Sequence, residues 1–184
     1  MGGYLNFDRQ NDGQSSLEEF CSCLERAHQS DLAWKYAMVS IHSALQAYMC
    51  IAIRDGNAIR TWKSQQAKKW LAAYREDEEL PIPQLDFFME IFDKTFSSYS
   101  EEGRESIKWL NDTRNGLVHF NTDSYSICRE SIKECCREAL QAIARTPAVA
   151  ASGSVFFYTE EQQQKFSELC QKAEELLKRH CANA

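Results

Sequence analysis

The sequence predicts an all-α helical bundle, and two observations support this fold class. Apolar residues recur at intervals of three and four along most of the chain, and no segment alternates between apolar and polar residues as a half-buried strand does. The 184 residues include only three prolines and seven glycines, which disfavours both a sandwich of short strands and a low-complexity chain. With 43% hydrophobic residues, the chain is long enough for one good core.

The first half of the chain predicts a loose arm followed by two helices. Residues 1–14 contain Asn-Asp-Gly and little periodicity, so we expect a flexible arm there and a single domain over residues 15–184. Ser16 and Glu19 form a capping-box pattern, which predicts a helix start. Residues 32–53 predict the central helix of the bundle. Polar residues interrupt this apolar segment, which disfavours a membrane span.

The second half predicts five further helices. We expect a break at residues 55–57, a helix over 58–75, an acidic connector over 76–83 and a short helix over 84–96. A longer helix is expected over 102–120. Ser124 or Ser126 is expected to cap the next helix, which ends near residue 145. Residues 146–158 predict a loop whose aromatic end docks on the chain's own core, or alternatively on a partner chain. Thr159 and Gln162 predict a capped helix over about 159–180.

Charge and cysteine usage restrict the class of protein. A formal net charge of -6 argues against coating nucleic acid by bulk electrostatics, although it allows a local basic surface. Eight cysteines without an apparent secretory signal predict free thiols and a cytoplasmic location. Neither Cys21 and Cys23 nor the adjacent Cys135 and Cys136 form a paired zinc pattern. Cys128 shares a helical face with Cys135, so both are interpreted as buried small hydrophobes, and no metal or other cofactor is expected.

The helix predicted over residues 102–120 places a cation where a hydrophobic residue is expected. Ile107, Leu110, Arg114 and Leu117 follow one helical stripe, whereas a second stripe contains Lys108, Asp112, Asn115 and His119. An uncompensated charge in a core is costly, so Arg114 needs an acceptor, a partner subunit or an anion. One interpretation pairs Arg114 with Asp112 and leaves His119 as a cap of the helix C-terminus.

Residues 113–120, "TRNGLVHF", resemble the signature of HEPN domains (higher eukaryotes and prokaryotes nucleotide-binding). That signature is an arginine, usually followed by a polar residue, with a histidine four to six positions beyond. Arg114, Asn115 and His119 match it. Residues 33–49 and 80–92 also resemble segments of the family, so the resemblance covers about residues 31–145. It implies a HEPN-like bundle of four to five core helices with additional flanking helices.

The resemblance also implies a ribonuclease that needs no metal and whose two motifs meet across a homodimer. A histidine can take or return a proton near neutral pH, and a guanidinium can hold a phosphate bidentately. The expected products carry 2',3'-cyclic phosphate and 5'-hydroxyl ends. The family further implies a toxin or phage-defence effector with an antitoxin or other regulatory protein as partner. Two alternatives are a non-catalytic module that binds a nucleotide, RNA or protein, and a purely structural helical domain.

Helix geometry and Gly116 bear on the expected catalytic role. At ~100° per residue, Arg114 and His119 point about 140° apart, so a second copy or a local distortion at Gly116 must bring such groups together. Gly116 departs from the larger residue that the resemblance leads us to expect. Asn115 is expected to orient His119 from one turn away, and Asp112 to hold Arg114 or tune the histidine. One interpretation of His42 is a second catalytic base, but a satisfied core histidine is favoured.

A local basic segment predicts where RNA binds. Residues 56–75 contain no acidic residue, and their cations alternate with Trp62, Trp70 and Tyr74. Such cations can follow phosphates while aromatic rings stack on unpaired bases. We therefore predict RNA contacts for Lys63, Lys68 and Lys69. The two tryptophans follow helical spacing and are instead expected to lie in the core.

Overall fold

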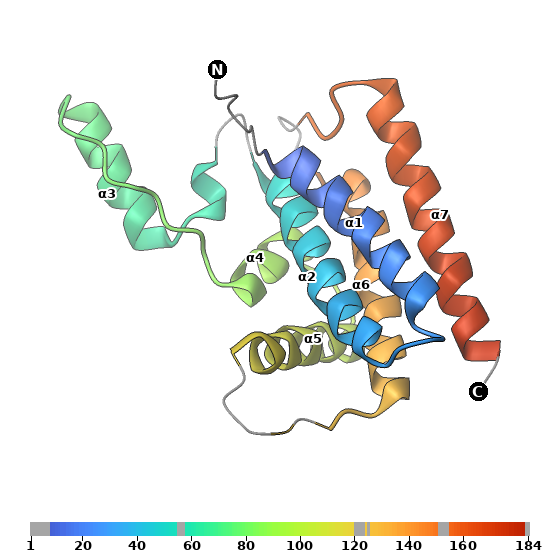
Figure 1. Ribbon diagram of the computed structural model, residues 1–184. Coiled ribbons are helices and arrows are strands. Elements are labelled where there is room, and N and C mark those ends of the chain that lie inside the picture. The colour runs from blue at the N-terminus through green and yellow to red at the C-terminus, as the bar shows by residue number, and fades with distance from the viewer. Residues whose placement is uncertain (1–7, 55–57, 120–123, 125, 151–154, 183–184) are drawn as a thin grey trace, which may run out of the picture.

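The computed structural model is helical over most of the residues that it describes, which are 8–54, 58–119, 124, 126–150 and 155–182 (Figure 1). The helices are α1 (Arg9–Arg26), α2 (Leu32–Ile53), the short 3-10 helix η1 (Ile59–Thr61), α3 (Ser64–Arg75), α4 (Phe88–Thr95), α5 (Glu101–His119), α6 (Arg129–Val149) and α7 (Glu160–Ala182). Within these ranges there is no strand, only one isolated β-bridge between Trp62 and Leu85. The predicted all-α class is confirmed.

Helix α2 forms the centre of the bundle. It contacts α1, α4, α5 and α6, and α7 packs on the outer side against α1 and α6. Helices α1, α2, α6 and α7 lie side by side, and α5 lies across the lower ends of α2 and α6 (Figure 1). Helix α2 is long and apolar enough to cross a membrane by length and composition. However, 72% of its most apolar window is buried inside the bundle, as expected for a core helix.

Helix α1 begins seven residues before the predicted start at Ser16, so the predicted arm over residues 1–14 is wrong for residues 9–14. The carboxylate of Asp8 caps the helix by accepting a hydrogen bond of 2.8 Å from the backbone N–H of Asn11. Gly13 does not break the helix. A Cβ at this position would lie 3.2 Å from the ring of Tyr48, so glycine permits close packing of α1 on α2. Residues 1–7 lie outside the described residues.

The start of α6 also differs from the prediction. Cys128, rather than Ser124 or Ser126, occupies the N-cap position, and its side chain makes no capping hydrogen bond. Cys128 is exposed, so its interpretation as a buried hydrophobe is wrong, whereas Cys135 is buried as predicted. The predicted ends of two elements, at residues 55–57 and 120–123, fall outside the described residues.

The end of α6 extends beyond the prediction because a threonine compensates for a proline. Pro147 lies inside the helix and has no backbone N–H to donate to the carbonyl of Ile143. The hydroxyl of Thr146 donates to that carbonyl at 2.6 Å instead. Residues 146–149 therefore continue the helix and do not belong to a loop.

Within the segment 155–158, Phe156 and Phe157 dock on the chain's own core as predicted, whereas Val155 and Tyr158 are exposed. The ring of Phe156 is buried and stacks on Tyr48 with 6.0 Å between centroids. The predicted cap of α7 is also confirmed. The hydroxyl of Thr159 accepts a 3.2 Å hydrogen bond from the backbone N–H of Gln162.

Residues 58–87, here called the arm, project away from the bundle (Figure 1). The sequence predicted one helix over residues 58–75, and this prediction is wrong at Trp62 and Lys63, where the chain leaves η1 before entering α3. The reason is a pairing with the returning chain. The N–H of Lys63 donates to Gln84 at 3.0 Å, and the N–H of Asp86 donates to Thr61 at 2.9 Å. These bonds fix the base of the arm.

Candidate functional site

Helix α5 carries the candidate site, and its core face differs from the prediction by one residue. The buried residues of this helix are Gly103, Ile107, Leu110, Thr113 and Leu117. Thr113, only 4% exposed, takes the core position that the sequence assigned to Arg114. Arg114 lies half-buried at the edge of this face. The edge position keeps the aliphatic stem of an arginine against the core while its guanidinium remains near the surface.

The guanidinium of Arg114 does not use all of its hydrogen-bond donors within the described residues. Its Nη1 donates to the side-chain oxygen of Asn115 at 3.0 Å. Its Nε is buried and has no hydrogen-bond partner within the described ranges. No carboxylate among the described residues forms an ion pair with Arg114, and the carboxylate of Asp112 instead accepts from Asn111 at 3.1 Å. The predicted Arg114–Asp112 pair is therefore not formed, and Arg114 keeps a donor for an anion.

His42 lies beside Arg114 and belongs to the same cluster. It is 3% exposed on α2, and its ring stacks on Phe88 with 4.1 Å between centroids. Burial lowers the pKa of His42 to about 4; the hydrogen bond to Asn111 opposes this change, and the nearby charge of Arg114 adds to it. The imidazole is therefore neutral at neutral pH.

The hydrogen bonds of His42 define its tautomer. Its Nε2 lies 3.1 Å from the side-chain oxygen of Asn111, which can only accept, so Nε2 carries the proton. The other nitrogen, Nδ1, is a buried acceptor without a partner among the described residues. The predicted core position of His42 is confirmed, but the histidine is only half satisfied.

Asn111 is the residue that the sequence analysis missed. It accepts from His42 and donates to Asp112, so it links α2 to α5 next to Arg114. Asn111, Arg114 and Asn115 occupy positions i, i+3 and i+4 of α5, which share one helical face. That spacing was visible in the sequence. The α2 partner was not, because His42 is 69 residues away along the chain.

His119 is the last residue of α5 and is exposed. Asn115 does not orient it, because the side-chain oxygen of Asn115 accepts from Arg114 and no hydrogen bond joins Asn115 to His119 in the described part of the chain. Helix α5 also continues without a break through Gly116. Within one chain, Arg114 and His119 therefore keep the divergent directions of a regular helix.

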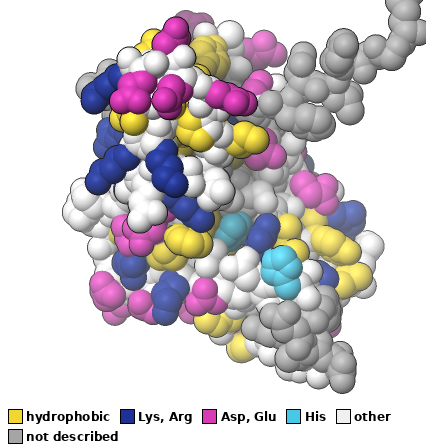
Figure 2. Space-filling model, turned by 90° about the vertical axis from the view of Figure 1, so that its left-hand side faces the viewer, with side chains coloured by type: hydrophobic (Ala, Val, Ile, Leu, Met, Phe, Trp, Pro, Cys, Tyr) yellow, Lys and Arg dark blue, Asp and Glu magenta, His cyan; other side chains and the backbone are white. Residues whose placement is uncertain are grey.

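The face that Figure 2 shows combines the arm with histidine and cationic side chains. Histidine surface lies beside a Lys or Arg side chain in a hollow below the projecting arm (Figure 2). Further Lys and Arg side chains lie between this hollow and a band of acidic residues at the upper end (Figure 2). The arm and these histidine side chains thus lie on the same side of the molecule.

The three lysines predicted to contact RNA differ in their surroundings. Lys63 is half-buried, and its Nζ lies 4.6 Å from the ring centroid of Phe87. Lys68 and Lys69 are exposed on α3. Lys63 therefore helps to hold the base of the arm, whereas Lys68 and Lys69 face solvent.

The prediction that Trp62 and Trp70 lie in the core is wrong. Both are only half-buried, and α3 buries a single residue, Ala73. The two indoles pack against each other with 5.5 Å between centroids, and Trp70 stacks on Tyr74 at 5.3 Å. Their rings therefore pack within the arm and not in the core of the bundle. The helix is interrupted at Trp62, between η1 and α3, and this interruption directs α3 away from the core.

Comparisons with known proteins add no relative: no family model, curated protein or solved structure matches this chain. In the described part of the chain, no group of three or more His, Cys, Asp or Glu side chains could hold a metal ion.

Proposed function

We propose that this protein is a metal-independent endoribonuclease of the HEPN type that acts as a homodimer in the cytoplasm. Arg114 and His119 are its catalytic residues. One observation carries this proposal: Arg114 is half-buried, has no carboxylate partner among the described residues, and lies on the same helix as an exposed histidine. A cation held in this way is suited to an anionic ligand.

The chemistry assigns one task to each side chain. A histidine removes the proton of a ribose 2'-hydroxyl, and the 2'-oxygen attacks the adjacent phosphorus. The bond from phosphorus to the 5'-oxygen breaks, and that oxygen receives the proton back from the same imidazole. The products are a 2',3'-cyclic phosphate and a 5'-hydroxyl. The guanidinium of Arg114 stabilises the charge that grows on the non-bridging oxygens.

A homodimer supplies the convergence that one chain lacks. In a regular helix, Arg114 and His119 point about 140° apart. A two-fold axis next to α5 would place Arg114 of one copy opposite His119 of the other, with two equivalent sites. We further propose that the nuclease is a toxin or phage-defence effector restrained by an antitoxin or another regulatory protein.

A second candidate function is a non-catalytic HEPN module that binds a nucleotide, RNA or protein through Arg114. The contact of Asn115 favours this alternative. Asn115 holds Arg114 and leaves His119 without an orienting hydrogen bond among the described residues. Such a site is better prepared to bind a phosphate than to transfer a proton.

An RNA cleavage assay in EDTA tests the proposed function. Wild type, His119→Ala and Arg114→Ala are incubated with structured and unstructured RNA, with His28→Ala and Arg104→Ala as matched controls outside the site. We expect cyclic-phosphate ends from wild type and both controls. Each site variant should lose about 100-fold or more in rate, as is typical for removal of a proton-transfer group or an oxyanion donor.

Two outcomes contradict the nuclease. Equal residual cleavage by all five proteins would indicate a contaminant. RNA binding by wild type without cleavage, abolished in Arg114→Ala, would establish the non-catalytic module instead.

A further inference from the structure

Three aromatic residues of the arm, Trp62, Trp70 and Tyr74, pack on one another and are here called the aromatic ladder. Trp62 contacts Trp70 edge to face at 5.5 Å, and Trp70 lies nearly parallel to Tyr74, with 7° between their planes and 5.3 Å between centroids. Tyr74 ends the ladder and is 65% exposed. Because its ring is already aligned with Trp70, a further flat group can extend the stack without reorganising the arm.

The arm also combines this ladder with positive charge. No acidic residue occurs from residue 58 to residue 75, although the whole chain has a net charge of -6. The exposed cations of this segment are Arg60, Lys68, Lys69 and Arg75. The acidic run over residues 76–79 follows directly after α3, so it limits the cationic surface to the helix itself. Figure 2 shows Lys and Arg side chains between the acidic band and the histidine surface.

A β-bridge and an ion pair fix the base of the arm. The β-bridge joins Trp62 to Leu85, and Lys94 of α4 forms an ion pair with Asp86 at 2.6 Å. The carboxylate of Asp86 is only 10% exposed, which favours a stronger interaction than at a fully solvated pair. The ladder is therefore attached to the bundle close to α4, whose Phe88 stacks on His42.

We infer that the arm binds single-stranded RNA, with Tyr74 stacking on an unpaired base while Lys68 and Lys69 contact phosphates. The inference rests on the proposed function, because the RNA would be the substrate of the site on the same face. Every base offers a flat face to an aromatic ring, and the phosphates require cations, so the ladder and its charges fit one ligand. A duplex fits poorly because its bases are already stacked within the helix.

Charge complementarity decides between RNA and a protein partner. Exposed apolar residues also occur on the returning strand of the arm, where Ile82 is 87% exposed. A second copy docked with α3 against α3 across a two-fold axis, however, would bring the same cations face to face. The acid-free segment 58–75 is therefore better matched by a polyanion.

RNA binding by the His119→Ala protein tests this inference without cleavage. Fluorescence anisotropy is measured with labelled oligouridylate, oligoadenylate and an RNA duplex. Tyr74→Ala is compared with Tyr74→Phe, which keeps the ring, and with Tyr36→Ala, which removes an exposed tyrosine of α2. Loss of one stacked base predicts a Kd for single strands about five-fold to about 100-fold higher in Tyr74→Ala. Tyr74→Phe and Tyr36→Ala should bind like the parent, and the duplex should bind more weakly.

The inference is overturned if Tyr74→Ala binds single strands as tightly as the parent, if Tyr74→Phe is equally impaired, or if the parent binds no RNA. It is also overturned if Tyr74→Ala changes only the molecular mass in sedimentation, since the occupant would then be a second copy. Circular dichroism checks that each variant retains its helices. Failure of the nuclease is separate: Tyr74-dependent binding without cleavage by wild type would leave the arm's role intact.

Discussion

Two buried polar atoms without partners among the described residues lie close to the candidate site, Nδ1 of His42 and Nε of Arg114. Such atoms cost free energy unless a ligand, a water or a partner chain completes them. The proximity of Arg114 helps to keep His42 neutral, because a second positive charge there would be repelled. The site therefore contains buried polar atoms without hydrogen-bond partners among the described residues, next to a positive charge.

His42 should make folding stability depend on pH. Its pKa is about 4 in the folded protein and near 6.5 when unfolded, so the unfolded chain binds the proton more readily. This stabilising contribution is complete above pH 6.5 and is lost as pH falls toward 4, by about 3 kcal/mol. His42→Gln, which does not titrate, should show a smaller decrease in unfolding free energy over this window. Urea denaturation at several pH values measures it.

His28→Gln is the matched control, because it removes an exposed histidine outside the site. An unchanged slope in His42→Gln would show that His42 is not held neutral by the fold.

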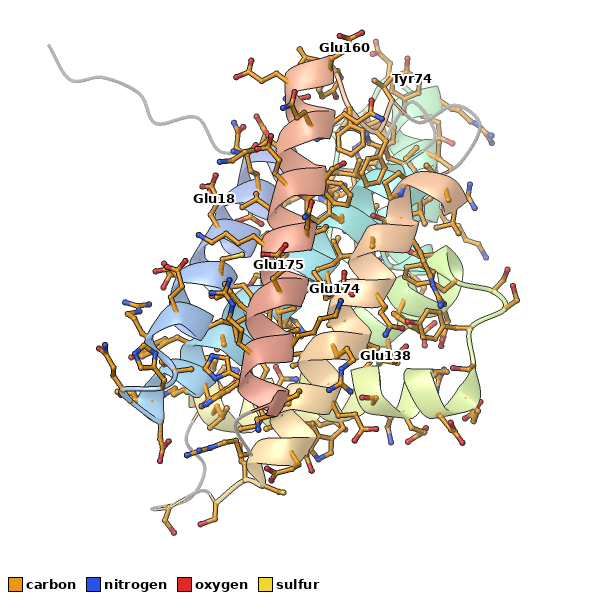
Figure 3. All side chains as sticks on the ribbon, turned by 90° about the vertical axis from the view of Figure 1, so that its right-hand side faces the viewer. Glu18, Tyr74, Glu138, Glu160, Glu174 and Glu175 are labelled. Carbon is orange, nitrogen blue, oxygen red and sulfur yellow. The ribbon has the colours of Figure 1, made fainter. Side chains whose placement is uncertain are left out.

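Helix α5 depends on a close contact with α6 near its start. Gly103 is buried, and a Cβ there would lie 2.6 Å from the ring of Tyr99 and 2.7 Å from the carboxylate of Glu138. The hydroxyl of Tyr99 donates to that carboxylate at 2.6 Å. Glu138 lies on α6, beside α5 (Figure 3). Burial and this hydrogen bond raise the pKa of Tyr99. The contact fixes where α5 begins relative to the bundle.

Gly103→Ala should therefore destabilise the protein although alanine favours helices. Overpacking typically costs about 1–3 kcal/mol and outweighs the gain of ~1 kcal/mol in helix propensity. Urea denaturation compares it with Glu102→Ala at the adjacent exposed position, which should change stability little. A Gly103→Ala protein more stable than wild type would show that Tyr99 and Glu138 move aside freely.

The proposed nuclease needs two copies of the chain. If Arg114 of one copy acts with His119 of the other, an equal mixture of Arg114→Ala and His119→Ala proteins should recover activity. Half of the randomly assorted dimers would be mixed and each would contain one intact site of two, giving about one quarter of wild-type cleavage. Cleavage is measured after the variants are unfolded and refolded together. No recovery would indicate that both residues act within one chain.

The cations of the arm should control how RNA binding depends on salt. Replacing both Lys68 and Lys69 with Glu should weaken binding and reduce the slope of log Kd against log salt by at least about 1.4, at about 0.7 per lost phosphate contact. Anisotropy titrations across a salt series measure the slope. The same replacements at Lys165 and Lys172, which are paired with Glu18 and Glu25 far along the chain, serve as the control. An unchanged slope would remove Lys68 and Lys69 from the binding surface.

Features that depend on a single element could be predicted from the sequence. Helical periodicity gave the all-α class and the bounds of α2 (Leu32–Ile53), and Thr159 with Gln162 gave the cap of α7. These features follow from neighbours within one or two helical turns, so the residues that cause them are close together in the sequence. Arg114, Asn115 and His119 were identifiable for the same reason.

Features that join residues distant in the sequence could not be predicted from it and became visible in the fold. Helix α1 continues through Gly13, which packs closely on Tyr48. The helix predicted over residues 58–75 is interrupted at Trp62, because the returning chain pairs with it there. The candidate site gained His42 through its contact with Asn111 across 69 positions of sequence. Periodicity predicts which face of a helix is buried, but it does not specify the element that packs there. The side chains of that element determine which polar atoms form hydrogen bonds.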